Sequence, residues 1–207
     1  MYKYPEAVIM VFCKAPIPGQ VKTRLVPPLT GEDAAQLHCE LTEKTLQTAT
    51  QNRLCEVSVW CSPTIDHPFF TRLAQTYSVD LRLQQGVDLG ERMHQAFCQV
   101  LAYYRSAVII GCDCPSLTSD DLEQTLSRLK QGKQCVLAPA EDGGYALIGL
   151  KQTQLTLFHN MPWGTDKVLG LTRARIQALN LDFHELNTHW DLDTPDDLMR
   201  CWRVNGN

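Results

Sequence analysis

The chain lacks a hydrophobic run long enough to cross a membrane, because its apolar segments fall well short of the roughly 18–20 residues that a spanning helix requires. It also lacks a large charge imbalance, since 19 Lys and Arg residues face 23 Asp and Glu residues and the net charge is −4. No overall field therefore favours nucleic acid or an anionic lipid surface, and any anion must be bound locally. The first residues show no signal-peptide pattern. We expect a cytoplasmic protein without a membrane span and without a nucleic-acid partner.

The sequence has no Cys-x-x-Cys pair, although it contains nine cysteines. An odd number of cysteines in 207 residues does not fit a small disulfide scaffold. Cys112 and Cys114 are expected on one side of a strand, with Asp113 on the other side. None of the six histidines stands at metal-ligand spacing from another. The cysteines are therefore predicted to be mostly buried free thiols, with a zinc site as the less favoured alternative.

Short apolar runs alternate with segments of helical periodicity along the chain. The predicted strands are 7–13, 55–61, 79–84, 107–113, 134–140, 145–150 and 181–186, and the predicted helices are 31–51, 66–77, 90–105, 119–131, 165–179 and 195–203. Continuous apolar strands that alternate with helices indicate an α/β fold, in which one mostly parallel mixed sheet is flanked by helices. The length fits a single domain over residues 1–207.

Polar residues follow several of the predicted strands at the point where each strand ends. In open α/β sheets, ligands bind outside the carboxyl ends of the strands, where loops lead into helices. The stretch VFCKAPIPGQVKTRL follows the first strand and holds Pro16, Pro18, Gly19, Lys22 and Arg24. Two prolines restrict this loop, the glycine permits a close backbone approach, and the two cations suit phosphate recognition. It matches neither GxxxxGK[ST] nor GxGxxG, and a solvated turn is the alternative interpretation.

Acidic residues at two other strand ends are candidate metal ligands. Asp113 stands in VIIGCDCPSL, where a carboxylate can hold a hard divalent cation, although it could instead cap the next helix. Asp191 and Asp193 stand two residues apart in HWDLDTPDDL and share one face of an extended segment. Either could supply a second carboxylate, and a turn rich in helix-start acids is the alternative.

Other candidates concern the acceptor and the nucleotide. Glu141 or Asp142, in PAEDGGYALIGL, could orient an acceptor or serve as a base, and a simple turn is the alternative. Gly90 is expected to begin a helix whose backbone N–H groups face a nucleotide, and Arg92 suits either a nucleotide contact or a surface ion pair. Trp163 is a candidate stacking ring, against the alternative of a packing anchor.

The motifs FCKAPIPGQVKTRL, LGERM, GCDCPSL, PAEDGGYALIGL, W-G-T and DLDTPDDL occur in this order. Together they resemble a bacterial family of small GT-A-type glycosyltransferases in the nucleotide-diphospho-sugar transferase superfamily, some of which are associated with arsenosugar biosynthesis. The chain is more distantly similar to nucleotidyltransferases such as molybdenum-cofactor guanylyltransferase. The resemblance implies a GT-A fold with a nucleotide-binding half, about 1–113, and a metal and acceptor half, about 114–207.

The resemblance also implies roles for individual residues. Lys22 and Arg24 match the family's KTRL and would contact nucleotide phosphates, and Gly90 in LGER would lie near the base or ribose. Asp113 matches the position that holds Mg²⁺ or Mn²⁺ in related enzymes, with Asp193 as a second ligand. The usual Asp-x-Asp is replaced here by Cys112-Asp113-Cys114, which resembles the nucleotidyltransferases as much as the glycosyltransferases.

Three functions follow from these patterns. The first is a metal-dependent transfer of a sugar from a nucleoside diphosphate sugar to a small acceptor, in which Lys22 and Arg24 aid the leaving diphosphate and Asp142 faces the acceptor. The second is nucleotidyl transfer from a nucleoside triphosphate to a phosphorylated acceptor. The third is a nucleotide-binding module without catalysis. A triphosphate clamp usually needs several glycines, and the first loop has one, which favours sugar transfer.

Overall fold

The computed structural model describes residues 1–205, and seven strands of this part form one sheet in the order β3-β2-β1-β4-β6-β5-β7. The strands are β1 Ala7–Lys14, β2 Glu56–Ser62, β3 Asp80–Leu83, β4 Ser106–Gly111, β5 Cys135–Pro139, β6 Tyr145–Leu150 and β7 Phe183–Glu185. Strand β6 runs antiparallel to both neighbours, whereas the other pairs are parallel. The predicted mostly parallel α/β sheet is confirmed.

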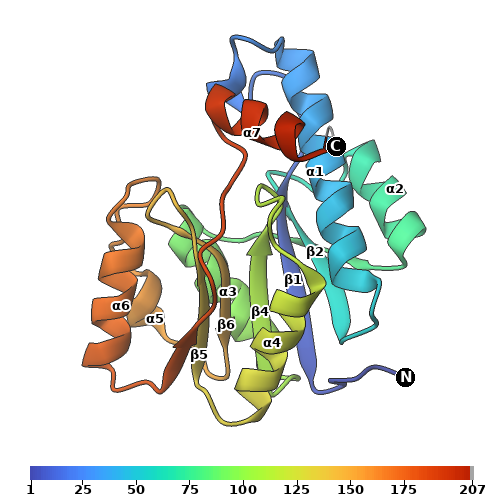
Figure 1. The fold of residues 1–207 in the computed structure, drawn as a ribbon. Helices are drawn as coiled ribbons and strands as arrows, with labels where there is room; N and C mark the ends of the chain where they lie inside the picture. Colours follow the sequence, from blue (N-terminus) through green and yellow to red (C-terminus); the bar gives the residue numbers. More distant parts are fainter. Residues whose placement is uncertain (206–207) are drawn as a thin grey trace.

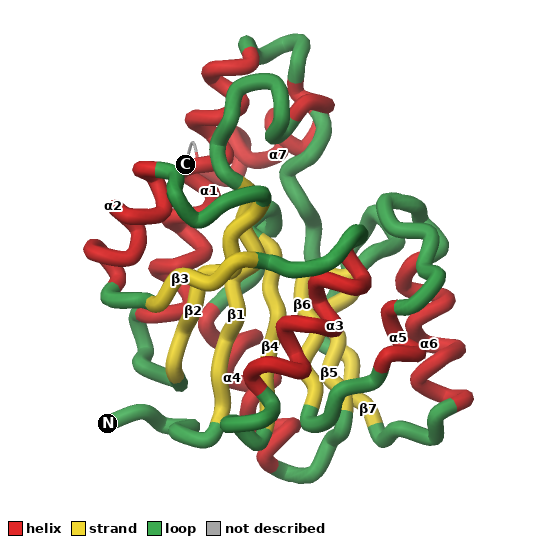
Figure 2. The backbone as a smooth tube through the Cα atoms, turned by 180° about the vertical axis from the view of Figure 1, so that it is seen from behind, coloured by secondary structure: helices red, strands yellow, loops and turns green. Residues whose placement is uncertain are grey.

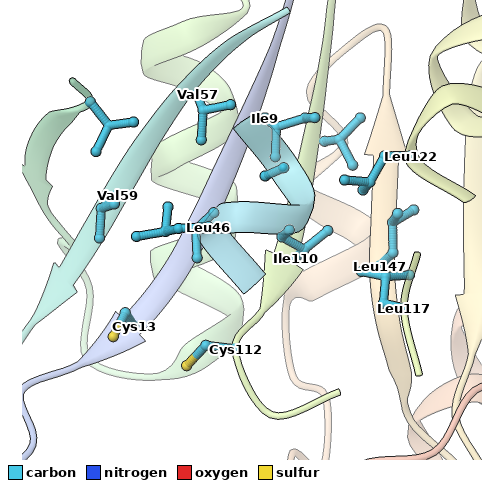
Figure 3. Packing of buried hydrophobic residues seen from close by; sticks show 14 of the residues in the cluster. Ile9, Cys13, Leu46, Val57, Val59, Ile110, Cys112, Leu117, Leu122 and Leu147 are labelled. Atoms are coloured by element: carbon cyan, nitrogen blue, oxygen red, sulfur yellow. The ribbon is translucent and has the colours of Figure 1, made fainter. Parts of the chain in front are cut away.

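Helices cover both faces of the sheet (Figures 1 and 2). They are η1 Thr23–Leu25, α1 Gly31–Thr50, α2 Pro68–Tyr77, α3 Leu89–Val100, α4 Ser119–Lys130, α5 Leu155–Phe158, α6 Val168–Ala178 and α7 Pro195–Asn205. Side chains of α1, α2 and α4 share one buried cluster with Ile9, Val11 and Cys13 of β1 (Figure 3). Side chains of α3, α5 and α6 form the other cluster with the intervening β1 residues. Successive residues of β1 thus alternate between two cores, which explains its continuous apolar sequence.

A third, smaller cluster lies beyond the carboxyl edge of the sheet. It joins Leu25 of η1, Leu41 of α1, Leu192 of the segment before α7, and Leu198 of α7, all of them buried. Figure 1 shows α7 beside the segment that follows β1, near the start of α1 and above the sheet. Burying these four side chains holds the loop after β1 and the segment before α7 against one another, because fully burying a leucine contributes about 1.5–3 kcal/mol.

Several element boundaries differ from the sequence-based predictions. The helix expected over 90–105 ends at Val100, because the N–H groups of Tyr103 and Tyr104 both donate to the Val100 carbonyl at 2.9 Å and close a turn. The edge strands β3 and β7 are shorter than predicted, as expected of strands that pair on one side only. Thr118 is the N-cap of α4, with a capping box to Asp121, in line with the predicted start.

Two tertiary contacts bring the late acidic segment to the ends of β4 and β5. The Leu192 N–H donates to the Asp113 carbonyl at 2.8 Å, and the His189 N–H donates to the Pro139 carbonyl at 2.8 Å. Residues 191–193 therefore lie against the loop that follows β4. No helix within the described residues combines the length and apolar character that a membrane crossing needs.

Candidate active site

A cavity of about 470 Å³ opens at the carboxyl edge of the sheet, between the ends of β1 and β4. This volume lies within the range of small-molecule sites. Its lining combines strand ends, the loop after β1 with η1, one residue of α1, the first turn of α3 and the segment before α7: Phe12, Cys13, Lys14, Gln20, Val21, Lys22, Thr23, Arg24, His38, Gln84, Leu89, Arg92, Gly111, Cys112, Asp113 and Asp193. Lys22, Arg24, Asp113 and Asp193, four of the candidates from the sequence, therefore face one cavity.

The ammonium of Lys22 is the central cation of this site. Its Nζ lies 2.6 Å from Asp113 Oδ1, 2.9 Å from Asp193 Oδ1 and 2.7 Å from the Leu192 carbonyl oxygen. The Lys22 side chain is 2% exposed, whereas the side chains of Asp113 and Asp193 are 45% and 40% exposed. Nζ donates hydrogen bonds to the Leu192 carbonyl and to Asp193 Oδ1, and it pairs with Asp113 Oδ1 by charge, so in this arrangement the ammonium is surrounded by protein oxygens.

The position of Lys22 depends on its backbone and on the leucine three residues later. Lys22 precedes η1 with φ 49° and ψ 35°, a left-handed conformation that is uncommon for a residue with a side chain. Leu25 is fully buried in the cluster with Leu41, Leu192 and Leu198, which holds η1 in place. The energy of this packing offsets the local backbone strain of about 1–3 kcal/mol and directs the Lys22 side chain toward the carboxylates.

The ion pairs shift the protonation equilibria of their members. Burial alone would raise the pKa of Asp113, but the charge and hydrogen bond of Lys22 hold it below its ordinary value. Burial alone would lower the pKa of Lys22, yet Asp113 and Asp193 together raise it. Asp113 and the Lys22 ammonium are therefore charged at neutral pH.

Asp191 completes a group of four carboxylates. Burial, followed by the negative charges of Asp142, Asp113 and Asp193, raises the pKa of Asp191 to about 7. One lysine does not compensate this much negative charge, and the site favours an additional cation. Asp113 and Asp193 already approach one common cation, Lys22 Nζ, to within 3 Å. Their oxygens are close enough to share a divalent ion, and carboxylate oxygens are the donors that Mg²⁺ and Mn²⁺ prefer.

Two guanidinium groups face the same cavity. Arg24 is 67% exposed, and its Nη1 lies 3.9 Å from Asp193 Oδ2. Arg92 is anchored, because its Nε donates to the Gly86 carbonyl and its Nη1 donates to Ser62 Oγ, both at 3.1 Å. Arg24 therefore keeps most of its donors for a ligand, whereas Arg92 is held rigidly on α3.

None of the three residues expected near the acceptor lines the cavity, and they are called the rim residues below. Asp142 is exposed, and its Oδ1 accepts a hydrogen bond from the Gly144 N–H at 2.8 Å. Glu141 instead forms a two-point ion pair with Arg200 of α7, at 2.8 and 3.2 Å. Trp163 is half-buried and packs edge-to-face against Tyr145, with ring centroids 6.5 Å apart.

Backbone conformation and close packing explain why glycine stands at the two candidate positions, Gly19 and Gly90. Gly19 adopts φ 78° in the turn before Lys22, a conformation that favours glycine. A Cβ atom on Gly90 would lie 2.5 Å from the Phe158 carbonyl oxygen and 2.7 Å from Trp163 Nε1. Gly90 thus permits close packing of α3 against the loop that carries Trp163, and its neighbours Leu89 and Arg92 line the cavity.

Sequence reasoning did not single out His38, Gln84 and Lys14, which also line the cavity. His38 is buried on α1, with Nε2 2.9 Å from the Lys14 carbonyl oxygen and Nδ1 3.9 Å from Asp113 Oδ1. Gln84 donates to the Trp60 carbonyl at 2.7 Å. Lys14 stands directly after Cys13 in the motif of the first loop, and this position is the one feature of the sequence that could have indicated its place in the cavity. No feature of the sequence indicated His38, because it lies 25 residues from Cys13 inside an amphipathic helix.

Comparison with protein families gives one match. A model described as "Uncharacterized protein conserved in bacteria (DUF2064)" matches residues 45–165. The chain belongs to this family. A comparison with curated proteins gives no match.

Comparison with solved structures supports the GT-A-like fold. A proposed nucleotide-diphospho-sugar transferase from Desulfovibrio desulfuricans G20 aligns over 98% of this chain and 89% of its own, with 29% identity and a TM-score of 0.89. CMP:2-keto-3-deoxy-manno-octonic acid synthetase, complexed with CTP, aligns over 97% of this chain and 98% of its own, with 12% identity and a TM-score of 0.62.

A third structure is glucosyl-3-phosphoglycerate synthase from Mycobacterium tuberculosis, in complex with Mn²⁺, UDP and glucosyl-3-phosphoglycerate. It aligns over 95% of this chain and 75% of its own, with 12% identity and a TM-score of 0.58. At 12% identity the last two show the fold alone. All three are transferases, and the expected resemblance to nucleotide-diphospho-sugar transferases, with a more distant one to nucleotidyltransferases, is confirmed.

Proposed function

We propose that the protein is a metal-dependent glycosyltransferase that moves a sugar from a nucleoside diphosphate sugar to a small acceptor. The convergence of Lys22, Asp113 and Asp193 beside Arg24 in one cavity of about 470 Å³ carries this proposal. Loops after two different strands deliver cations and carboxylates to a common place, as a diphosphate with a divalent ion requires. The proposal is in line with the fold of the Desulfovibrio desulfuricans protein.

Asp113 and Asp193 are the proposed ligands of Mg²⁺ or Mn²⁺. When bound, the ion supplies positive charge that neutralises the diphosphate. Lys22 balances the two carboxylates in the free protein, and its buried ammonium would have to turn partly away from these carboxylates and the Leu192 carbonyl to contact a phosphate. Arg24 offers a planar pair of donors to the diphosphate oxygens without such a rearrangement.

The reaction places the remaining residues in definite roles. The acceptor oxygen forms a bond to the anomeric carbon while the bond to the diphosphate breaks, and the electron pair of that bond goes to the leaving oxygen. Arg24 and Lys22 stabilise this developing charge, which is typically the largest catalytic contribution. Asp142 takes the acceptor's proton as base or orients the acceptor. Glu141 and Trp163 stay proposed acceptor contacts, and Gly19, Gly90 and Arg92 proposed nucleotide contacts.

Nucleotidyl transfer is the second candidate, favoured by one specific observation. A single acid follows β4, because Asp113 is flanked by Cys112 and Cys114, and an Asp-x-Asp pair is lacking there. In that reaction a phosphorylated acceptor attacks the α-phosphate of a nucleoside triphosphate and pyrophosphate leaves. The loop after β1, with one glycine and two prolines, offers few of the backbone donors that a triphosphate clamp uses.

A thermal-shift panel tests these alternatives, with nucleoside diphosphate sugars and nucleoside triphosphates measured in Mg²⁺, Mn²⁺ or EDTA. A ligand at 100 times its dissociation constant adds about 2.7 kcal/mol, which corresponds to about 5–10 °C for a chain of this size. We expect such a shift with a UDP- or GDP-sugar and metal, and its loss in EDTA. A response to triphosphates alone favours nucleotidyl transfer, and no response to any nucleotide contradicts both.

Asp113→Asn should abolish the metal-dependent part of the shift. The matched control is Asp182→Asn, because Asp182 is exposed, pairs with Lys133 and precedes β7 at the opposite edge of the sheet. A response of Asp113→Asn to metal equal to that of the parent protein would show that the proposed site is wrong.

A further inference from the structure

The floor of the cavity brings together three soft donor groups that the proposed transfer does not use. Cys13 is the last residue but one of β1, Cys112 directly follows β4, and His38 projects from α1. Their ligand atoms all lie within 4.8 Å of one another, and Cys13 Sγ lies 3.7 Å from His38 Nε2. Figure 3 shows the side chains of Cys13 and Cys112 beside each other at the ends of neighbouring strands. The three residues come from segments far apart in the sequence, so the fold alone creates the group.

The fold positions this group on regular elements. Strands β1 and β4 are paired in parallel, with Phe12 opposite Gly111, so Cys13 and Cys112 follow at equivalent places on the same face. Both belong to the core cluster between the sheet and α1. The three side chains are each at most about 4% exposed, so they cannot turn freely away from one another. This rigidity matches the preorganisation that a metal centre requires.

Two thiolates and an imidazole are the donors that Zn²⁺ prefers, whereas Mg²⁺ and Mn²⁺ prefer oxygen. In a tetrahedral site, zinc–sulfur bonds of about 2.3 Å and zinc–nitrogen bonds of about 2.0 Å place the ligand atoms roughly 3.5–4 Å apart. The present separations of up to 4.8 Å need only a small contraction to reach this range. Ligation through His38 Nε2 exchanges its hydrogen bond with the Lys14 carbonyl for the ion.

The surroundings of His38 support ligation. Its other nitrogen, Nδ1, lies 3.9 Å from Asp113 Oδ1, and a carboxylate in this position orients a metal-bound imidazole and increases its basicity. All three residues line the cavity, which gives an ion an entry path. Cys55, before β2, and Cys114, after β4, are also buried thiols that border cavities, but neither belongs to a group of three thiol, imidazole or carboxylate ligand atoms within reach of one another among the described residues.

We propose that Cys13, His38 and Cys112 form a binding site for a thiophilic ion, Zn²⁺, with three protein ligands and one open position toward the cavity. This site is distinct in its donor chemistry from the carboxylate site of Asp113 and Asp193, and it does not depend on the proposed transfer. It reverses the preference drawn from the sequence, in which zinc was the less favoured interpretation.

Titration of the reduced, full-length protein with Co²⁺, a spectroscopic substitute for Zn²⁺, tests the proposal. We expect one equivalent to produce thiolate-to-cobalt charge transfer and the visible bands of tetrahedral cobalt, and Zn²⁺ but not Mg²⁺ to abolish them. Each of Cys13→Ser, Cys112→Ser and His38→Gln should weaken binding by at least about 100-fold, since loss of even an outer partner costs 10–100-fold. Cys55→Ser is the matched control, because it changes another buried thiol and should leave binding unchanged.

Co²⁺ has a competing location at Cys98 and His94 on the surface of α3, where Cys98 Sγ lies 3.7 Å from His94 Nε2. Loss of the cobalt bands in Cys98→Ser, with retention in Cys13→Ser, would overturn the proposal. X-ray absorption at the zinc edge on the unsubstituted protein keeps the test independent of how the variants fold. Two sulfur ligands are expected there, and a shell of oxygen and nitrogen only would contradict the site.

Discussion

The cavity has two regions of opposite donor chemistry, separated by the 3.9 Å between His38 Nδ1 and Asp113 Oδ1. The oxygen region, Asp113, Asp191 and Asp193, lies on loops, and two of its carboxylates are partly exposed. The sulfur region, Cys13, His38 and Cys112, is buried at strand ends and on a helix. Partly hydrated carboxylates suit an ion that arrives and leaves with a substrate, whereas buried soft donors suit a firmly held ion.

The two regions also differ in how their charge is balanced. Lys22 neutralises part of the oxygen region from within, and the remaining negative charge appears in the raised pKa of Asp191. In the sulfur region, burial raises the pKa of the Cys13 thiol and favours its neutral form. Asp113 of the oxygen region is therefore charged before any ion binds, whereas the Cys13 thiol loses its proton only when its ion binds.

The largest expected effect comes from removing the internal cation of the oxygen region with Lys22→Met. The two carboxylates then keep only the exposed Arg24, 3.9 Å from Asp193, as a compensating cation among the ion pairs described above, and we expect the free energy of unfolding at pH 7 to fall by about 1–3 kcal/mol. This is less than for a fully buried pair because water screens the exposed carboxylates. Urea denaturation measures the loss, with exposed Lys167→Met as the matched control.

The same variant should bind Mg²⁺ more tightly than the parent protein, because the ammonium no longer competes for Asp113 and Asp193. Stabilisation by increasing Mg²⁺ concentrations measures this affinity. Equal urea midpoints for Lys22→Met and the parent, or weaker Mg²⁺ binding by the variant, would contradict the account of Lys22 as the counterion of this region.

An intermediate effect is expected on the pH dependence of stability in metal-free protein. The pKa of Asp191 is about 7 in the folded state, above its ordinary value of 3.8, so the folded protein binds this proton more tightly. The contribution to stability is fully present below about pH 4 and is lost as the pH rises to 7 and above. Asp191→Asn should flatten this slope in urea titrations between pH 4.5 and 8, and Asp182→Asn should not. A parallel slope in Asp191→Asn and the parent would show that Asp191 titrates normally.

The smallest effect is expected at the rim. Glu141 pairs with Arg200, both side chains are substantially exposed, and the Arg200 guanidinium lies 4.5 Å from the centre of the Trp190 ring. Exposed ion pairs contribute little to stability, so Glu141→Gln should leave the urea midpoint and the Mg²⁺ response unchanged. A loss of Mg²⁺ response in Glu141→Gln would extend the oxygen region to include the rim.

Much of the fold was predictable because local patterns and long-range packing agree. The run AVIMVFC contributes alternate residues to two cores, which is why it is apolar throughout and why helices lie on both sides. The ends of the elements were less predictable, because the end of α3 depends on a turn that closes on Val100 and the length of β7 depends on pairing with β5.

The candidate site was predictable where chemistry follows directly from a strand end. Asp113 and the Lys22 loop satisfy this rule, since the carboxyl ends of parallel strands meet at one edge. The spacing alone left Asp191 and Asp193 open, and the family resemblance favoured Asp193. The packing of Leu192 brings both to the site with different surroundings. His38 could not be found this way, because only the docking of α1 on β1 places it beside Cys13.

The sequence by itself determined the α/β class, the mostly parallel sheet and the edge at which polar residues gather, because these depend on apolar periodicity and chain direction. Tertiary structure alone decided that Lys22 is held by two carboxylates and that two thiols meet an imidazole. Those contacts join residues 25–171 positions apart, and their distances follow from how the helices and loops pack on the sheet, which no local pattern encodes.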